Sequence, residues 1–199
     1  ISQVAGTFNM YGGLITGGTA TASGGNIYLN NGVINISGGI VENGLADGSA
    51  ASSNGGNIYM ARGELNISGD AIIRGGTGTR PVARTNGGGN IMALSGAKVN
   101  IKDSTIRYGY AAANGGNLLL GKGTYNLENV KVYGGVAAGK GANLYRTTDD
   151  PCTMTNCEIG DMAANYCPHC KQTVTWTEAG ETLSGHCYLT GAKNITAAY

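Results

Sequence analysis

Short alternations of apolar and polar residues recur along the chain, and they predict strands rather than helices. The clearest example is residues 24–39, GGNIYLNNGVINISGG, which has glycine at both ends. A two-residue period places four apolar residues of this segment on one face: Ile27, Leu29, Ile34 and Ile36. The pattern predicts two short strands that each bury one face.

The same segment returns as part of a longer unit. A Gly-Gly-Asn or Gly-Ala-Asn motif opens each unit and recurs every 26 to 33 residues, at Asn26, Asn57, Asn90, Asn117 and Asn143. A second asparagine follows the first four of these after nine or ten residues, at Asn35, Asn66, Asn100 and Asn126. A third apolar stretch and a loop of variable length complete the unit. Each unit therefore predicts three short strands and one loop.

Repeats of this length predict a solenoid, because one unit cannot bury its apolar face alone but stacked units share a core. Three strands per unit and the lack of a strict hexapeptide favour an all-β, right-handed parallel β-helix over residues 1–162. Since neighbouring coils lie about 4.8 Å apart, about six coils would form a rod roughly 30 Å long. Residues 163–199 form a separate small module that caps the helix or links it to a further segment.

The repeated asparagines are expected to stack in two columns, one for each asparagine of the unit. Side-chain amides in such a column donate to one neighbouring coil and accept from the other, which satisfies polar groups at the bends. Asparagine also tolerates the left-handed backbone that a corner needs. We expect a structural ladder; the alternative is that aligned amides contact sugar hydroxyls.

The coil sequence over residues 6 to about 162 resembles the right-handed β-helix repeats of secreted, adhesin-like surface proteins of bacteria. The segment CPHCKQTVTWTEAGETLSGHCYLTG is similar to a short module that recurs in large cell-surface proteins of gut Firmicutes. The positions that carry this second likeness are Cys167, Cys170, Val174, Trp176, Gly185, His186, Tyr188 and Leu189. The resemblance implies an extracellular or cell-surface location and no particular activity.

The five cysteines fall into two groups. Aligning the last degraded unit under the preceding one places Cys152 below Tyr125 and Cys157 below Val130, which predicts two small buried side chains. The second group lies in the C-terminal module: Cys167, His169, Cys170, His186 and Cys187.

The Cys-Pro-x-Cys turn, followed by an expected hairpin strand at QTVTW, is typical of a zinc knuckle. His186 or Cys187 would complete a closed, structural zinc site with Cys167 and Cys170. The alternative is a disulfide that joins Cys167 or Cys170 to Cys187, as a secreted protein would favour. A redox Cys-x-x-Cys is a third interpretation, and the sequence lacks the βαβ pattern of that class.

Composition narrows the function classes. The 199 residues include 36 glycines, 13% are charged, and the net charge is +1. This near-neutral balance argues against a nucleic-acid partner or a basic membrane contact, and no apolar run is long enough for direct membrane insertion.

Candidate ligand-binding residues are few. Arg74, Arg107 and Lys131 are expected to stack as a basic column on the third strand, which would suit a carboxylated or sulfated glycan, or else form a solvated face. Trp176 is either a sugar-stacking platform or a plug that closes the end of the rod. The only acidic cluster, Asp149 and Asp150 with Asp161 a coil away, is typical of a solvated loop.

The sequence thus favours a secreted, non-enzymatic stalk or display surface that binds host or dietary glycans or surface proteins. A polysaccharide lyase or glycoside hydrolase acting on an acidic polysaccharide is the alternative, because this fold hosts such enzymes, but fold alone does not establish activity. Catalysis would need converging carboxylates, whereas the acids here are dispersed. A further alternative is a filament subunit that associates end to end through unpaired strand edges.

Overall fold

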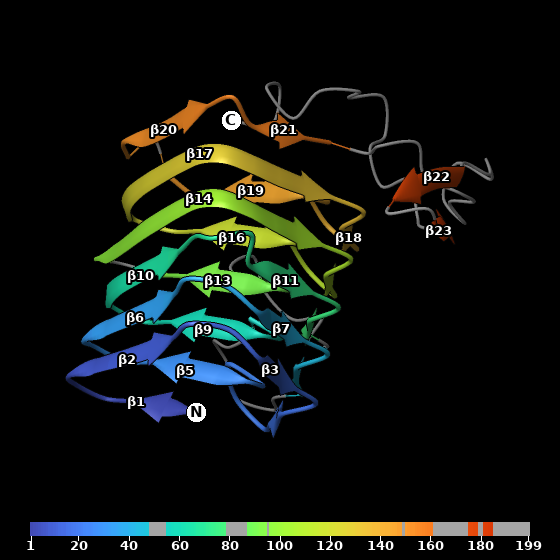
Figure 1. Cartoon of the computed structure of the whole chain (residues 1–199). Coiled ribbons are helices and arrows are strands. Elements are labelled where there is room, and N and C mark those ends of the chain that lie inside the picture. The colour runs from blue at the N-terminus through green and yellow to red at the C-terminus, as the bar shows by residue number, and fades with distance from the viewer. Residues whose placement is uncertain are drawn as a thin grey trace.

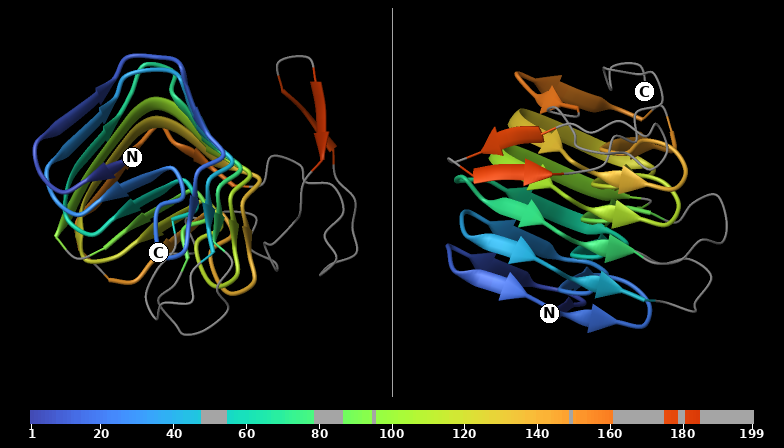
Figure 2. Two further views of the ribbon diagram at one scale, coloured as in Figure 1. Left: turned by 90° about the horizontal axis from the view of Figure 1, so that it is seen from below. Right: turned by 90° about the vertical axis from the view of Figure 1, so that its right-hand side faces the viewer.

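A computed structural model describes residues 1–47, 55–78, 87–94, 96–148 and 150–160, together with the backbone of 175–178 and 181–184. Within these residues the protein is all-β, and its parallel strands wind into a solenoid of about five turns (Figure 1). The predicted parallel β-helix is confirmed, with about five turns in place of the six expected. Viewed along the axis, successive coils superimpose as one closed outline (Figure 2).

The Gly-Gly-Asn segments form one side of the solenoid, which we call sheet A. Its six strands are β1 (Ser2–Gln3), β5 (Ile27–Leu29), β9 (Ile58–Met60), β13 (Ile91–Ala93), β16 (Leu118–Leu120) and β19 (Leu144–Arg146). Each strand pairs in parallel with the equivalent strand of the next coil. Equivalent residues of successive units lie opposite each other: Ile27 pairs with Ile58, and Ile91 pairs with Leu118.

The second and third apolar stretches form the ten-stranded sheet B. The second stretch gives β2 (Thr7–Met10), β6 (Val33–Ile36), β10 (Gly63–Ile67) and β20 (Cys152–Thr155), and the third gives β3 (Leu14–Thr16), β7 (Ile40–Glu42), β11 (Ile72–Arg74) and β21 (Glu158–Ile159). In two coils one long strand covers both stretches, as β14 (Ala97–Arg107) and β17 (Gly123–Tyr133).

A column of left-handed residues bends sheet B between its two stretches. Gly38, Asp70, Asp103, Asn129 and Asn156 occupy this corner, and all have positive φ. The Asn129 amide donates to the Asp103 carboxylate across coils at 2.7 Å. Asp and Asn adopt this conformation at low cost, and their polar side chains suit an exposed bend.

A fourth, two-residue strand that the repeat did not predict follows β3, β7, β11, β14 and β17. These strands form sheet C: β4 (Thr19–Ala20), β8 (Leu45–Ala46), β12 (Thr77–Gly78), β15 (Tyr110–Ala111) and β18 (Val136–Ala137). The variable loops connect sheet C of one coil to sheet A of the next. The connections at 47–57 and 79–90 are about twice as long as those at 21–26, 112–117 and 138–143.

One apolar core runs the length of the solenoid. Ile27, Leu29, Ile34 and Ile36 all point into it and are at most 1% exposed, as the alternation predicted. The inward column Ile34, Leu65, Val99, Tyr125 follows the strand register from coil to coil. At the two ends the same columns finish in half-buried side chains, including Phe8 at the first coil and Cys152 at the last.

The predicted alignment of the last unit is confirmed. Cys152 pairs with Tyr125 and Met154 with Leu127, and both side chains pack against the core with Cys157. In the C-terminal module, β22 (Thr175–Glu178) and β23 (Glu181–Ser184) pair in antiparallel fashion, and β22 overlaps the strand expected at QTVTW in two residues, Thr175 and Trp176. The rest of the module lies outside the described residues.

Candidate functional site

Five buried asparagines line the corner where sheet A begins, and they form a continuous hydrogen-bonded ladder. Asn26, Asn57, Asn90, Asn117 and Asn143 are at most 3% exposed. Each side-chain amide of the first four donates to the carbonyl oxygen of the next asparagine at 2.7–2.8 Å. The predicted structural ladder is confirmed.

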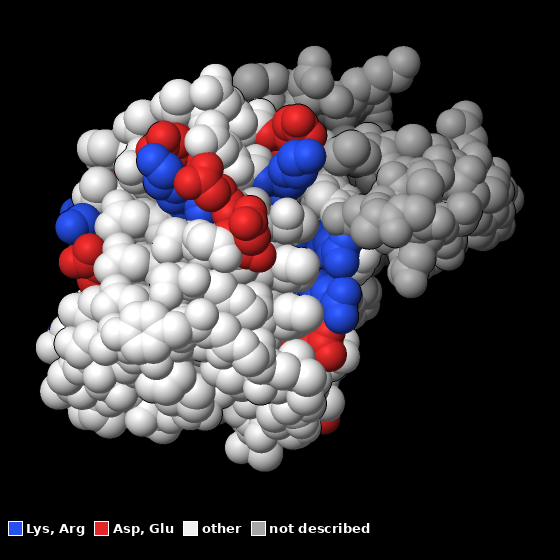
Figure 3. Space-filling view, viewed as in Figure 1, with Lys and Arg blue, Asp and Glu red and all other residues white. Residues whose placement is uncertain are grey.

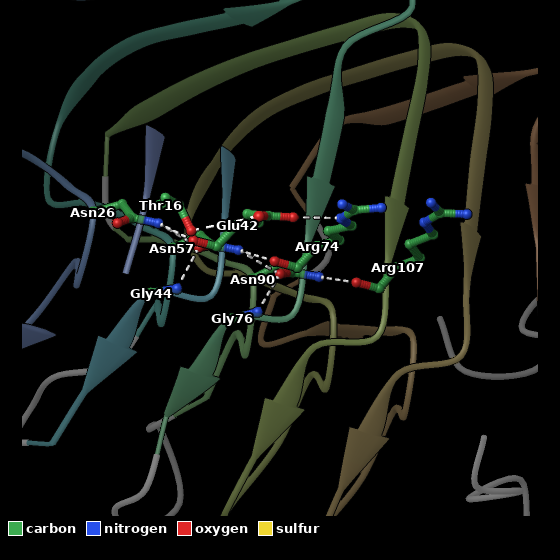
Figure 4. A network of polar contacts seen from close by, with 9 residues as sticks. All are labelled: Thr16, Asn26, Glu42, Gly44, Asn57, Arg74, Gly76, Asn90 and Arg107. Carbon is green, nitrogen blue, oxygen red and sulfur yellow. Dashed lines mark hydrogen bonds and ion pairs between the residues drawn. The ribbon is translucent and has the colours of Figure 1, made fainter. Parts of the chain in front are cut away.

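Two further bonds tie each of the first four rungs to the backbone, while Asn143 at the end of the ladder has one, from the Gly135 N–H. The amide of Asn57 also donates to the Arg74 carbonyl at 2.7 Å, and its Oδ1 accepts from the Gly44 N–H at 2.8 Å (Figure 4). The other inner rungs repeat this pattern. The ladder therefore joins sheet A to the turn between sheets B and C in every coil, and the asparagines satisfy backbone groups that the tight corner leaves unpaired.

The left-handed residue at this corner is glycine, not asparagine. Gly24, Gly55, Gly88, Gly115 and Gly141 have positive φ and precede each ladder asparagine by two residues. None of the ladder asparagines has a positive φ. The expectation that asparagine supplies the left-handed backbone here was wrong, because glycine does so while asparagine supplies hydrogen bonds.

A second ladder lies on the outer face of sheet B. Asn35, Asn66 and Asn100 each donate to the asparagine one coil earlier at 2.7–2.8 Å, and the column starts at Asn9, which the repeat analysis missed. Asn126 lies in register with Asn100 and is exposed. Asn9 and Asn126 are exposed and the other three are half-buried; Asn100 also donates to the Glu64 carboxylate at 3.2 Å, whereas Asn9, Asn35 and Asn66 keep donor and acceptor capacity that the ladder does not use.

The third strand carries a mixed polar column beside the inner ladder. The register aligns Thr16, Glu42, Arg74, Arg107 and Tyr133 in successive coils. Glu42 accepts from the Arg74 Nε at 2.6 Å, and its other oxygen lies 3.5 Å from the Thr16 hydroxyl (Figure 4).

Arg107 is held by two aromatic rings. Its guanidinium donates to the Tyr133 hydroxyl at 3.0 Å and lies 5.2 Å from the centre of the Tyr108 ring. The two tyrosine rings meet edge to face at 5.7 Å. Burial raises the pKa of Tyr133 to about 12, although the neighbouring Arg107 opposes that shift. Tyr133 is therefore a neutral donor and acceptor at physiological pH.

The expected basic column is only partly formed. Arg74 and Arg107 are neighbours in it, but Lys131 pairs with Thr105 and so lies in the adjacent outward column. The continuous pairing of β14 with β17 aligns Asn100 with Asn126 and Ile106 with Val132, and placing Lys131 opposite Arg107 would need a two-residue shift that breaks both alignments. Glycan binding by these basic residues stays a prediction.

Charged side chains of sheet B pair across neighbouring coils. The four ion pairs among the described residues join Arg74 to Glu42, Lys98 to Glu64, Lys102 to Glu128 and Lys131 to Glu158. Most of the charge visible in Figure 3 lies over the later coils, while the face of the early coils carries little. Opposite charges in directly paired positions favour the observed register.

The outer face of sheet A carries an apolar column that the sequence analysis did not single out. The Tyr28 and Tyr59 rings stack at 5.4 Å with 9° between their planes. Tyr59, Met92 and Leu119 form a second buried cluster with the half-buried Tyr28 and Tyr145 packed against it. The sequence did contain a signal for this column: in each of these strands the second residue is large, namely Tyr28, Tyr59, Met92, Leu119 and Tyr145.

The cysteine chemistry is only partly visible. Cys152 and Cys157 are free and half-buried, and burial raises the pKa of the Cys152 thiol, so it behaves as an apolar core residue. Cys167, Cys170, His186 and Cys187 lie outside the described residues, as do Asp149 and Asp161, and the Trp176 side chain is not described. The zinc and disulfide alternatives both stay predictions; among the residues described, no three potential ligands converge on a metal position.

No protein-family profile matches the sequence, and no curated protein or solved structure shows significant similarity to it. Throughout the described part of the chain there is no helix with the length and hydropathy of a membrane span.

Proposed function

We propose that this chain is a rigid, non-enzymatic stalk or display element of the extracellular surface, with glycans as its class of ligand. The observation that carries the proposal is the buried ladder, which runs through Asn26, Asn57, Asn90, Asn117 and Asn143 without a break. Each coil is joined to the next on three sheets and by this ladder, so bending one coil against another breaks many bonds together. A stalk that presents a surface at a distance needs this property.

The arrangement of charge favours display over catalysis. The carboxylates of Glu42, Glu64 and Glu128 are each engaged by a basic side chain of a neighbouring coil. Glycoside hydrolysis needs two carboxyl groups facing one sugar bond, and elimination needs a basic residue free to accept a proton. Carboxylates that are already paired with basic side chains on the outer face of sheet B are poorly suited to either task.

The second asparagine ladder, on the outer face of sheet B, is the surface we assign to the glycan. Asn9, Asn35 and Asn66 present amides at the inter-coil spacing of about 4.8 Å on the outer face of sheet B, and the Lys98–Glu64 pair on the neighbouring strands is closed at 3.1 Å. Amide donors and acceptors suit sugar hydroxyls. A neutral glycan fits this surface better than an acidic one, which would compete with Glu42 for Arg74 and with Glu158 for Lys131.

Binding to an array of neutral and uronate-rich polysaccharides tests the proposal. The double variant Asn35→Ala/Asn66→Ala should weaken binding about tenfold, since two hydrogen bonds of about 0.5–1.5 kcal/mol each are lost. Lys98→Ala is the matched control on the same strand series, and it should leave binding of a neutral glycan unchanged. Unchanged binding by the double variant would remove the ladder as the binding surface.

The enzymatic alternative is tested by assaying the same preparations for release of reducing ends or unsaturated uronates from these polysaccharides. We expect none. Turnover that disappears when acidic residues of one face are replaced would establish a lyase or hydrolase and overturn the non-enzymatic proposal.

A further inference from the structure

Five Asn-Gly pairs occur along the chain, at 31–32, 43–44, 54–55, 86–87 and 114–115. Asparagine followed by glycine is chemically labile, because glycine has no side chain to shield its backbone nitrogen from the asparagine side chain. The nitrogen can then attack the side-chain carbonyl carbon and close a five-membered ring. Residues 54 and 86 lie outside the described residues, so the structure distinguishes the reactivity of the other three pairs.

The first of these pairs is open to this reaction. Asn31 is exposed at the corner that joins β5 to β6, and Gly32 follows it with a φ of 97°. In the part of the chain that the structure describes, neither the Asn31 side chain nor the Gly32 N–H has a hydrogen-bond partner. No bond within the protein therefore has to break before the Gly32 nitrogen turns toward the Asn31 side chain.

The other two described pairs are held by hydrogen bonds. The Gly44 N–H donates to an asparagine of the buried ladder at 2.8 Å. The Gly115 N–H donates to the Lys140 carbonyl at 2.9 Å, and the Asn114 Oδ1 accepts from the Lys140 N–H at 2.8 Å. Both glycine nitrogens must leave these bonds before they react, which requires local opening of the coil. The fold therefore protects both pairs.

The solenoid itself requires glycine at position 32. Gly6, Gly32 and Gly63 form one corner column with positive φ, and a Cβ on Gly32 would lie 2.4 Å from the Gly6 carbonyl oxygen. The residue before the glycine is not constrained in this way, since it is Ala5 in the first coil and Arg62 in the third. The second coil thus keeps a labile pair at a corner where the glycine cannot be exchanged.

We propose that Asn31 is a site of spontaneous deamidation. A solvent base takes the proton of the Gly32 nitrogen, which forms a bond to Cγ of Asn31. The side-chain amide nitrogen receives a proton and leaves as ammonia, which gives a cyclic succinimide. Water then opens the ring at either carbonyl and yields aspartate or isoaspartate, with no oxidant or cofactor. This inference does not depend on the display function.

The two products change the corner in different ways. The pairing of β5 with β9 and of β6 with β10 places residue 31 opposite the exposed Arg62 of the next coil. An aspartate carboxylate at this position gains an opposite charge across the coils. Isoaspartate carries the main chain through the side-chain carbons and adds one backbone atom between β5 and β6. The aspartate form therefore keeps the strand register, whereas the isoaspartate form lengthens one coil relative to its neighbours.

Peptide mapping by mass spectrometry tests the proposal on the full 199-residue chain, kept folded in mildly alkaline buffer for several days. Digestion at acidic pH stops the reaction, and fragment spectra assign each change to a residue. Asn31 should exchange its amide for a carboxyl group at least about tenfold faster than Asn43 or Asn114, whose reaction needs local opening. Asn30 is equally exposed but is followed by asparagine, so it should stay unmodified.

The same incubation in guanidinium chloride is the control, because unfolding removes the protecting hydrogen bonds. Asn31, Asn43 and Asn114 should then react at similar rates. Asn31→Gln should abolish the change at this position and leave the circular dichroism spectrum unaltered, because the longer side chain is exposed and would have to close a six-membered ring. Equal rates at the three asparagines in the folded protein would overturn the proposal, as would an intact Asn31 or the same preference for Asn31 after unfolding.

Discussion

Replacing Asn57 by leucine tests whether the buried ladder holds the coils together. Leucine has the same number of side-chain heavy atoms and the same branching as asparagine but can neither donate nor accept a hydrogen bond. Asn57 makes four hydrogen bonds: it donates to the Arg74 carbonyl and to Asn90, and it accepts from the Gly44 N–H and from Asn26. Its side chain is fully buried, so no water replaces them.

The expected cost follows from these four bonds. At about 1 kcal/mol each, their loss amounts to about 4 kcal/mol. The Gly44 N–H then has no remaining partner among those described, which adds about 1–3 kcal/mol for a buried unsatisfied donor. Burial of the leucine methyl groups offsets part of this, so we expect a net loss of about 4 kcal/mol.

Asn66→Leu is the matched control one strand further along the same coil. Asn66 makes two ladder bonds, to Asn35 and from Asn100, and lies at the surface where water substitutes for them. We expect a loss of about 1 kcal/mol or less. Urea unfolding followed by circular dichroism measures both variants, and amide hydrogen exchange reports whether the neighbouring coils open together. Equal losses for Asn57→Leu and Asn66→Leu would refute the structural role assigned to the buried ladder.

Three further predictions concern the coil junctions. Gly116→Ala should destabilise the fold by about 3 kcal/mol in urea unfolding, because its new methyl group would lie 2.2 Å from a backbone carbonyl oxygen. Gly12→Ala is the control: it has open space around it and should change stability by less than about 0.5 kcal/mol. The pKa of Tyr133 in the folded protein is raised from 10.0 to about 12, so its contribution to the free energy of unfolding is complete below pH 10 and is lost as the pH rises from about 10 to about 12. When unfolding is measured at graded pH, Tyr133→Phe should therefore lose stability less steeply over that range. Lys98→Glu should cost about 0.5–1 kcal/mol by placing two carboxylates opposite each other, and adding Glu64→Lys should restore stability in a double-mutant cycle; no recovery would show that the 3.1 Å pair has no role in the register.

The solenoid was predictable because its repeat constrains every coil in the same way. Gly-Gly-Asn marks the same corner five times, with alanine as the second residue once, and the apolar residues that follow it alternate with a two-residue period. Core columns and both asparagine ladders follow from that alignment. The last unit was also placed correctly, because Cys152 and Met154 keep the apolar spacing of Tyr125 and Leu127.

Other features were hidden for physical reasons. Two residues such as Leu45–Ala46 are too short to show any period, so the strands of sheet C look like loop sequence. Lys131 was expected in the same column as Arg107 because both are basic residues of the third stretch. The continuous pairing of β14 with β17, which aligns Asn100 with Asn126, places Tyr133 rather than Lys131 opposite Arg107. The aromatic contacts of Arg107 depend on three-dimensional packing and have no signature in the repeat.

The two-residue strands of sheet C have a consequence for how this chain can diversify. They fix the point at which each connection leaves the coil, and the Gly-Gly-Asn corner fixes the point at which it returns, so the connection at 79–90 spans the same gap as the much shorter one at 112–117. Doubling the length of such a segment costs only about 0.6 kcal/mol of chain entropy. One flank of the molecule can therefore accept insertions turn by turn, while the frame that supports them keeps its dimensions.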